Sequence, residues 1–313
     1  MADYFAMNHN ELTAEKTALE AQYKKFQDMN LKLNMARGKP GPHQMDLAMD
    51  LLKMDNYITD NGFDARNYGE LKGLESARKL FADILGCKTS QVFAGGNSSL
   101  QLMYDTVSKA YTHGLLHSEK PWCKEESVKW LCPSPGYDRH FKVTESFGFE
   151  LITIPMTSTG PDMDTVEEAI KDPAVKGIWC VPKYSNPTGI TFSEDTVRRL
   201  VEMPTAAPDF RIFWDNAYCV HDLYDETDEL ANIFDLARAA GTEDRVVAFA
   251  STSKITFPGA GIGFIGASPA VIAEFSKRLK AGLISADKLN QLRHVRFLRD
   301  AEGLALSLIH ISE

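Results

Sequence analysis

Short apolar segments that alternate with helical patterns constrain the fold of this chain most strongly. Residues 246–250 are apolar, β-branched and aromatic, which is typical of a buried strand. Six similar segments lie at 92–94, 128–132, 151–154, 177–181, 211–214 and 262–267. Helical patterns occupy 10–29, 73–85, 99–111, 137–146, 164–170, 193–201 and 289–300. We therefore predict an α/β fold with roughly seven strands in a mostly parallel sheet between helices.

Charge and cysteine content narrow the class of protein. The 313 residues carry a net charge of −9 and contain no basic tract, which argues against nucleic acid or a membrane surface as a partner. The N-terminus lacks a secretory pattern, and no apolar run is long enough to span a bilayer. Five cysteines are scattered without metal-type spacing, as in a reducing compartment. We expect a cytoplasmic protein without a metal site.

The loops after the strands are where chemistry is expected, because ligands of such sheets bind beyond the carboxyl ends of the strands. Lys254 follows segment 246–250, and a partly desolvated amine is a nucleophile toward carbonyls. Asp215 follows segment 211–214, and its carboxylate requires a partner. That partner is either a protonated ring nitrogen of a ligand or a basic group of the protein.

Three further loops carry polar or aromatic residues of the same kind. Gly96, Asn97 and Ser98 lead into a helix and suit a phosphate, although an ordinary helix cap explains them equally well. Tyr137 follows a Pro-Ser-Pro-Gly turn, where its ring either stacks on a flat cofactor or packs at the start of its helix. Asn186 lies in an Asn-Pro-Thr-Gly turn with an amide that can donate to a ligand oxygen.

Each of these signals is weak alone, but all of them lie at strand ends. A phosphate cradle, an aromatic ring, an amide donor, an acid, Tyr218 and an amine are the parts that hold pyridoxal 5′-phosphate. Lys254 would form a Schiff base with this cofactor. Asp215 would keep the pyridine nitrogen protonated, so that the ring acts as an electron sink.

The order of these motifs resembles the fold-type-I pyridoxal-phosphate aminotransferases of classes I and II. The motifs are Tyr68 to Gly73, Gly96 to Ser98, Tyr137, Asn186 to Gly189, Asp215 to Tyr218 and Ser251 to Lys254. Within the class, Ala36 to Pro40 and Ser253 to Gly261 look most like a bacterial aspartate aminotransferase subgroup. The resemblance implies a large cofactor-binding domain followed by a small domain.

The resemblance also implies a role for each residue of the motifs. Lys254 would carry the cofactor and move the proton between the substrate Cα and the cofactor's C4′, while Asp215 would pair with the ring nitrogen. Asn186 and Tyr218 would bond the phenolic oxygen, and Tyr137 would stack on the ring. The phosphate would be held by Gly96, Asn97, Ser98, Ser251 and Ser253.

Two more residues concern the substrate and the partner subunit. Tyr68 would reach the phosphate of the neighbouring subunit, which implies a homodimer with shared active sites. Gly38 lies in the segment that closes over the substrate, and Asn186 would also contact the substrate. Arg139, Arg293 and Arg296 are candidates for binding substrate carboxylates, while His140 and His221 are expected to be surface groups.

The sequence departs from the family pattern in two places. Ile262 stands eight residues after the lysine, where most relatives have a phosphate-binding arginine. The chain also stops before most of the small domain. We expect an N-terminal helix and arm at 1–40, a cofactor-binding domain at 41–285, and the start of an interdomain helix at 286–313. After Gly303 the sequence is apolar, and we expect it to be non-native rather than a buried terminal helix.

These expectations define a leading function and three alternatives. The leading function is transfer of an α-amino group, with aspartate as the donor and 2-oxoglutarate as the acceptor. A β-lyase or decarboxylase would use the same cofactor. An inactive fragment would bind the cofactor without turnover. The sensor domain of a transcription regulator is the non-enzyme alternative, against which the short acidic N-terminal region argues.

Overall fold

The computed structural model describes residues 4–32, 40–222, 226–300 and 303 of the chain. It divides the chain into two compact units, Met1–Lys39 and Pro40–Glu313. In the first unit, α1 (His9–Asp28) begins at Asn8, whose side chain accepts hydrogen bonds from the backbone of Asn10 and Glu11. Glu11 bonds back to the Asn8 amide, so a capping box starts this predicted helix.

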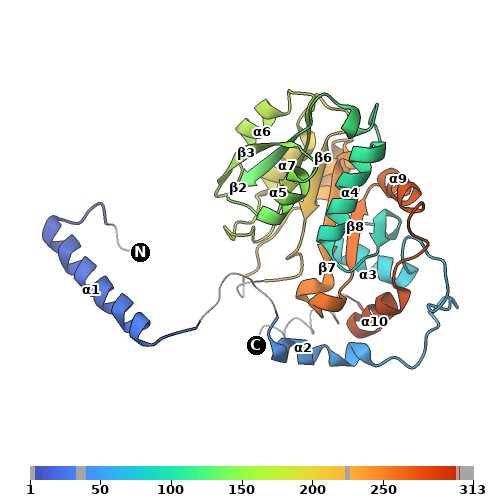
Figure 1. Ribbon diagram of the computed structural model, residues 1–313, viewed down its shortest axis with the longest axis horizontal. Helices are drawn as coiled ribbons and strands as arrows, with labels where there is room; N and C mark the ends of the chain where they lie inside the picture. Colours follow the sequence, from blue (N-terminus) through green and yellow to red (C-terminus); the bar gives the residue numbers. More distant parts are fainter. Residues whose placement is uncertain (1–3, 33–39, 223–225, 301–302, 304–313) are drawn as a thin grey trace. The chain divides into compact units, whose positions relative to one another are not determined.

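The second unit is built on an eight-stranded sheet with the order β1-β8-β7-β6-β5-β2-β3-β4 (Figure 1). Its strands are β1 (Val92–Ala94), β2 (Lys129–Ser134), β3 (Glu150–Thr157), β4 (Gly160–Pro161), β5 (Val175–Cys180), β6 (Arg211–Asp215), β7 (Val246–Ser251) and β8 (Gly263–Ala267). β4 and β8 run antiparallel to their neighbours, and the other strands share one direction. The predicted α/β class is confirmed. β4 was not predicted, because two residues are too few to show a pattern.

The helices of the second unit include three that the sequence pattern did not predict. The predicted ones are α3 (Glu75–Leu85), α4 (Ser99–His113), α5 (Asp138–Glu145), α6 (Met163–Ala169), α7 (Glu194–Glu202) and α10 (Lys288–Leu298). The others are α2 (Pro42–Leu47), α8 (Ile233–Ala239) and α9 (Pro269–Leu279). Pro42 begins α2, where its fixed φ suits the first helical position.

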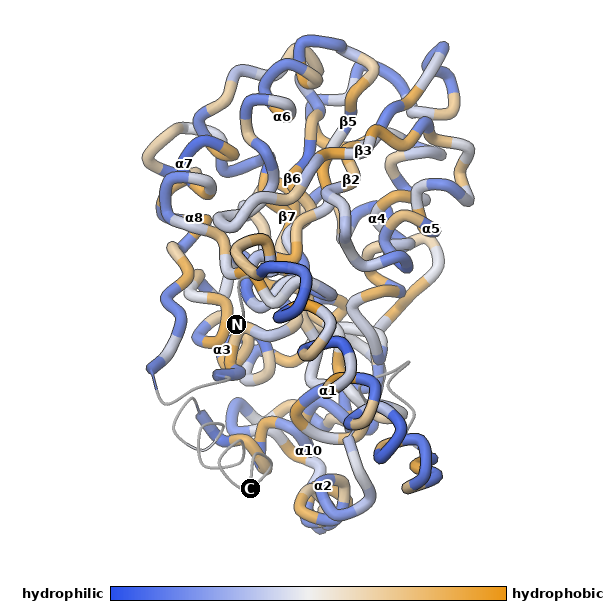
Figure 2. The backbone as a smooth tube through the Cα atoms, turned by 90° about the vertical axis from the view of Figure 1, so that its left-hand side faces the viewer, coloured by the Kyte–Doolittle hydropathy of each residue, from blue (hydrophilic) through white to orange (hydrophobic). Residues whose placement is uncertain are grey.

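The pleat of the central strands divides the core into two layers. Along β6, Ile212 and Trp214 pack on one face with α3, α6, α7, α8 and α10, whereas Phe213 packs on the other with α4, α5 and α9. Both faces of the central strands are therefore buried, which is why their sequences are continuously apolar. Figure 2 shows this apolar character on β5, β6 and β7, with hydrophilic stretches on the surrounding helices. No helix among the described residues is long and apolar enough to cross a bilayer.

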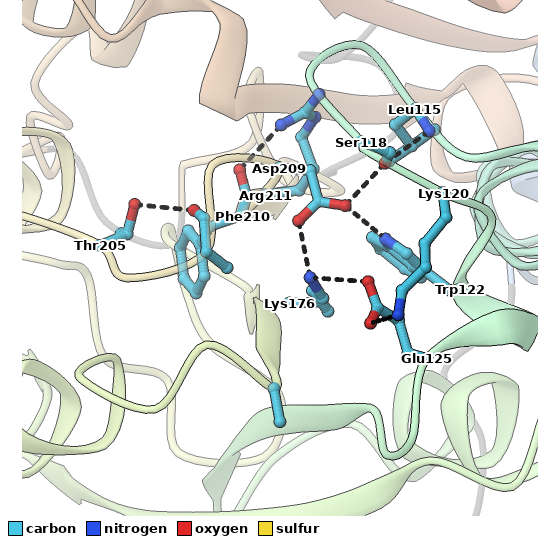
Figure 3. Close-up of polar contacts among 12 residues, drawn as sticks. Leu115, Ser118, Lys120, Trp122, Glu125, Lys176, Thr205, Asp209, Phe210 and Arg211 are labelled. Atoms are coloured by element: carbon cyan, nitrogen blue, oxygen red, sulfur yellow. Dashed lines mark hydrogen bonds and ion pairs between the residues drawn. The ribbon is translucent and has the colours of Figure 1, made fainter.

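A buried polar cluster lies at the amino ends of β5 and β6, opposite the strand ends discussed below (Figure 3). We call Ser118, Trp122, Glu125, Lys176 and Asp209 the amino-end cluster. The Asp209 carboxylate accepts hydrogen bonds from Ser118 Oγ at 2.6 Å, Trp122 Nε1 at 2.7 Å and Lys176 Nζ at 3.0 Å. Glu125 lies 3.5 Å from the same ammonium group. These contacts hold the segment after α4 against the amino ends of the central strands β5 and β6.

Candidate active site

The carboxyl ends of the parallel strands bring the predicted site residues to one edge of the sheet. The strand order reverses between β5 and β2, and ligands of such sheets lie outside the strands at the reversal. Tyr137 follows β2, and Asn186 follows β5. Both line one cavity together with His140 and Trp179. The topology therefore places the predicted ring stacker and amide donor beside each other.

Asp215, the last residue of β6, is 6% exposed and uses its two carboxylate oxygens differently. Oδ2 lies 2.8 Å from Nε2 of His140. Oδ1 is buried and has no hydrogen-bond partner among the described residues. The Asp215 carboxylate can thus bind a basic group of the protein and a protonated ring nitrogen of a ligand at the same time. The protein base takes one oxygen, and the other is left for a ligand.

His140 was predicted to lie at the surface, and this prediction is wrong. It is 1% exposed, and its ring stacks on Trp179 with centroids 4.7 Å apart. It also makes an edge contact with Tyr137 at 5.0 Å. Tyr137 is the cap residue before α5, and His140 lies three residues later in its first turn, so the two rings lie beside each other. This spacing could have indicated from the sequence that His140 lies near Tyr137, but not that His140 contacts the buried Asp215.

Tyr218 lies in the turn that follows β6, three residues after Asp215. Burial raises the pKa of its phenol, and the charge of Asp215 and the nearby Tyr137 raise it further. The hydroxyl therefore keeps its proton at neutral pH and can donate a hydrogen bond. His221 was expected at the surface but is half-buried, 5.9 Å from the Tyr218 ring. Its Nε2 lies 3.4 Å from the backbone oxygen of Lys254.

Lys254 ends a short 3₁₀ turn (Thr252–Lys254) directly after β7 and is half-buried. The backbone amides of Ile255 and Thr256 both donate to the Thr252 carbonyl at 2.9 Å, which closes the turn. Just before it, Ser251 Oγ lies 3.1 Å from Ser253 Oγ. The lysine and the two predicted phosphate-binding hydroxyls therefore belong to one compact segment.

The loop after β1 is held against β8 by backbone contacts. Gly95 N–H donates to the Gly263 carbonyl at 2.9 Å, and Gly263 N–H donates to the Gly96 carbonyl at 3.2 Å. Gly96 has φ +73°, a left-handed conformation that favours glycine. Ser98 caps α4 by accepting from the Gln101 amide at 3.3 Å. The helix-cap interpretation therefore holds for Ser98, which does not prevent the α4 N-terminus from binding an anion.

Ile262, which stands at the arginine position of the family pattern, belongs to the hydrophobic core. Its side chain is 2% exposed and packs in the core layer that includes α3 and α10. Gly261 instead faces the hydroxyls. A Cβ added there would lie 3.2 Å from Ser253 Oγ and 3.3 Å from the Asn97 carbonyl. The glycine thus lets the backbone approach these groups closely, and it lines one cleft with Gly96 and Asn97.

Several predicted residues lie elsewhere or outside the described part of the chain. Tyr68 is 77% exposed in the segment before α3, and Arg139 is exposed on α5. Arg296 donates to the Ile58 carbonyl at 3.0 Å. Arg293 is half-buried and lines a cleft with Asn97 and other residues of the cradle. Gly38 and residues 304–313 are outside the described residues.

The residues present fit pyridoxal phosphate on two observations. The buried Oδ1 of Asp215 has no partner among the described residues, as a site for a protonated ring nitrogen requires. Gly261, whose missing side chain lets the backbone come close to the Thr252 and Ser253 hydroxyls, lines one cleft with Gly96 and Asn97 at the start of α4. Among the described residues, no group of three or more His, Cys, Asp or Glu could hold a metal ion.

Comparison with known proteins identifies the family of this chain. The fold and the strand-end residues define an aminotransferase-like α/β protein. The family model described as aspartate amino-transferase matches residues 7–311, so the chain belongs to the aspartate aminotransferase family. An aspartate aminotransferase of Corynebacterium glutamicum is 48% identical over 289 residues, which cover 91% of this chain and 67% of that protein. The enzyme class predicted from the sequence is confirmed.

Solved structures support the same assignment. The aspartate transaminase of Corynebacterium glutamicum superposes with a TM-score of 0.91 at 45% identity, covering 98% of this chain and 73% of that one. The α-aminoadipate aminotransferase LysN of Thermus thermophilus, complexed with N-(5′-phosphopyridoxyl)-L-leucine, superposes with a TM-score of 0.67 at 23% identity. LysN is covered to 66% and this chain to 88%, and the likeness shows a shared fold. The chain is shorter than these relatives, as predicted.

Proposed function

We propose that this chain binds pyridoxal 5′-phosphate through Lys254 and transfers an α-amino group from aspartate to 2-oxoglutarate. The observation that carries the proposal is the buried Oδ1 of Asp215, which has no partner among the described residues although Oδ2 is held by His140. A carboxylate buried in this way is costly unless a cationic group meets it. A protonated pyridine nitrogen is such a group, and this family membership makes it the expected ligand.

Each neighbouring residue then has a defined task. Tyr218 donates its hydroxyl hydrogen to the phenolic oxygen, since burial keeps the phenol protonated. Asn186 donates its amide to the same oxygen, and Tyr137 covers the ring from the loop after β2. Ser251, Ser253, Ser98 and the backbone of Gly96 and Asn97 hold the phosphate through hydroxyls and amides.

The bound cofactor supplies an electron sink for the electrons released at the substrate Cα. Lys254 binds it covalently, and on release its amine removes and returns the proton at Cα. Lys254 is half-buried, which limits the access of water to its amine. His140 keeps the Asp215 carboxylate in place during this cycle by holding Oδ2 at 2.8 Å.

We also propose that the active form is a homodimer. The exposed ring of Tyr68 makes no contribution to the site of its own chain among the contacts described, which supports a role in the partner's phosphate site. Sedimentation of the Tyr68→Ala variant, together with cofactor titration, tests this assignment. A dimer that retains full cofactor affinity would exclude a phosphate contact.

Spectroscopy tests the covalent attachment. The purified chain should bind pyridoxal phosphate with a visible absorbance band, and borohydride should bleach the band and fix the cofactor to the lysine-containing peptide. Lys254→Ala should lose both. Lys183→Gln is a matched control, because Lys183 is a buried amine that follows β5 and pairs with Asp222 at 2.9 Å. A Lys254→Ala protein that keeps the same fixed chromophore would refute the attachment.

Product analysis distinguishes the reaction types. Transamination of aspartate with 2-oxoglutarate yields glutamate and oxaloacetate in equal amounts. A β-decarboxylase would yield alanine without glutamate, and a β-lyase would yield a 2-oxo acid and ammonia. Bound cofactor with no product at all would identify the inactive fragment considered above.

A further inference from the structure

The first turns of α10 contact both connections that form the phosphate cradle. Asn290 Nδ2 donates to the Gly261 carbonyl at 3.2 Å. Gln291 Nε2 donates to the Ala94 carbonyl at 3.1 Å, where β1 passes into the glycine loop. α10 comes from a distant part of the sequence, so its side chains fix the relative position of loops that are not neighbours along the chain.

His294, one turn after Asn290, is fully buried, and its contacts define its protonation. Nδ1 lies 2.9 Å from the Asn290 carbonyl. Since a carbonyl only accepts, Nδ1 carries the hydrogen. Burial lowers the pKa of this imidazole below its ordinary value, although the Asn290 carbonyl opposes the shift, and the ring is neutral. Nε2 therefore has a lone pair and can only accept a hydrogen bond.

The accepting nitrogen faces the turn that bears the lysine. Nε2 lies 2.9 Å from Thr256 Oγ1 and 3.2 Å from Thr252 Oγ1. These threonines stand two residues after and two residues before Lys254. Thr252 Oγ1 in turn accepts from the Ile262 amide at 2.9 Å, which ties the turn to β8. The imidazole thus closes the buried side of the turn, while backbone bonds close it internally.

We propose that His294 is a positioning residue for Lys254. Its Nε2 accepts the Thr256 hydroxyl hydrogen, holds the 252–256 turn against α10, and thereby sets the direction from which the Lys254 amine reaches the cofactor. A displacement of about 1 Å at such a group can cost on the order of a hundredfold in rate. The inference rests on the proposed function, because it requires Lys254 to bind the cofactor.

Two substitutions of His294 test the Nδ1 contact and the Nε2 contact separately. In His294→Gln, the amide oxygen can reach the place of Nε2 and accept from Thr256. In His294→Asn, the shorter amide can replace only Nδ1. We expect His294→Asn to raise the Kd of pyridoxal phosphate roughly tenfold, the worth of about one buried hydrogen bond, and to change the visible circular dichroism of the bound cofactor. His294→Gln should stay within about threefold of the parent chain.

A double-mutant cycle tests the path through the threonine. Thr256→Val should reproduce the effect of His294→Asn, and the double variant should be no worse than either single variant. His113→Asn is the matched control, because His113 is exposed and its Nδ1 also contacts a threonine hydroxyl, that of Thr112 at 2.7 Å. The control should leave the Kd and the dichroism unchanged.

A measurement without cofactor keeps this inference distinct from the proposed function. Amide hydrogen exchange of residues 252–256 should accelerate in His294→Asn and not in His294→Gln, with β5 as the internal reference. If the parent chain forms no lysine-bound chromophore, the proposed function fails and the positioning role falls with it. If the chromophore forms and His294→Asn lowers only the free energy of unfolding, with unchanged Kd, dichroism and exchange, the positioning role is refuted and the proposed function stands.

Discussion

Replacing Asp209 by alanine gives the sharpest test of how the sheet is held together at the end away from the active site. The substitution removes the carboxylate that accepts from Ser118, Trp122 and Lys176 in the amino-end cluster (Figure 3). Lys176 is 6% exposed, so its ammonium group would stay buried with Glu125 as its remaining carboxylate, at 3.5 Å. Two neutral donors would lose their acceptor as well.

The expected loss follows from these contacts. Removing one partner of a buried ion pair costs about 3–5 kcal/mol, because it leaves a buried charge uncompensated. An unsatisfied neutral donor costs about 1–3 kcal/mol, but costs within one network do not add. We therefore expect Asp209→Ala to lower the free energy of unfolding by about 4 kcal/mol. Asp209→Asn retains an accepting oxygen and should lose roughly half as much.

Urea denaturation followed by tryptophan fluorescence and by circular dichroism measures this loss. Glu168→Ala is the control, since Glu168 forms an ion pair with Lys171 on the surface and such pairs contribute about 0–1 kcal/mol. A loss below about 1 kcal/mol for Asp209→Ala would refute the reasoning, because it would mean that the Lys176 ammonium group is not left buried without compensation.

Three further outcomes follow from the same structure. Burial alone would raise the pKa of Asp209, but hydrogen bonds from Ser118, Trp122 and Lys176 lower it below the ordinary value. The difference in free energy of unfolding between the parent chain and Asp209→Asn should therefore persist at neutral pH and become smaller below about pH 4, as the carboxyl group of the folded chain takes up a proton. Urea titrations at several pH values measure this difference. Gly263→Ala should lower stability by about 1–3 kcal/mol in the same assay and weaken cofactor binding, because the new Cβ would lie 2.7 Å from the Ser98 carbonyl; unchanged cofactor affinity would contradict this. Asp215→Asn should keep the absorbance band yet lose transamination by at least about a hundredfold, measured as glutamate formed, since the ring nitrogen would lose its charged partner; parent-like turnover would exclude that role.

The sequence predicted most of the sheet and the location of the site because both depend on local patterns. Continuous apolar strands such as 246–250 follow from burial on both faces, and the predicted helix at 73–85 ends at Gly86, whose φ of +68° favours glycine. Lys254, Asp215 and Asn186 were proposed as site residues because residues at the carboxyl ends of parallel strands meet at one side of the sheet. α8 has seven residues, too few to show a helical repeat, whereas α9 carries Ile272, Phe275 and Leu279 at helical spacing, a pattern that the sequence analysis did not use.

Tertiary structure alone decided which side chains meet. Nothing local to α5 indicates that His140 is buried against Asp215, 75 residues away, or that one carboxylate oxygen is left for a ligand. The neighbours of Gly261 likewise come from separate segments, so only the folded chain shows that this glycine, and not Ile262, faces the hydroxyls. The sequence by itself determined the class of fold and the chemistry of the strand ends, since these follow from periodicity and residue type. The partners of each polar group were decided by folding, because a hydrogen bond depends on the distance between atoms and not on their separation along the chain.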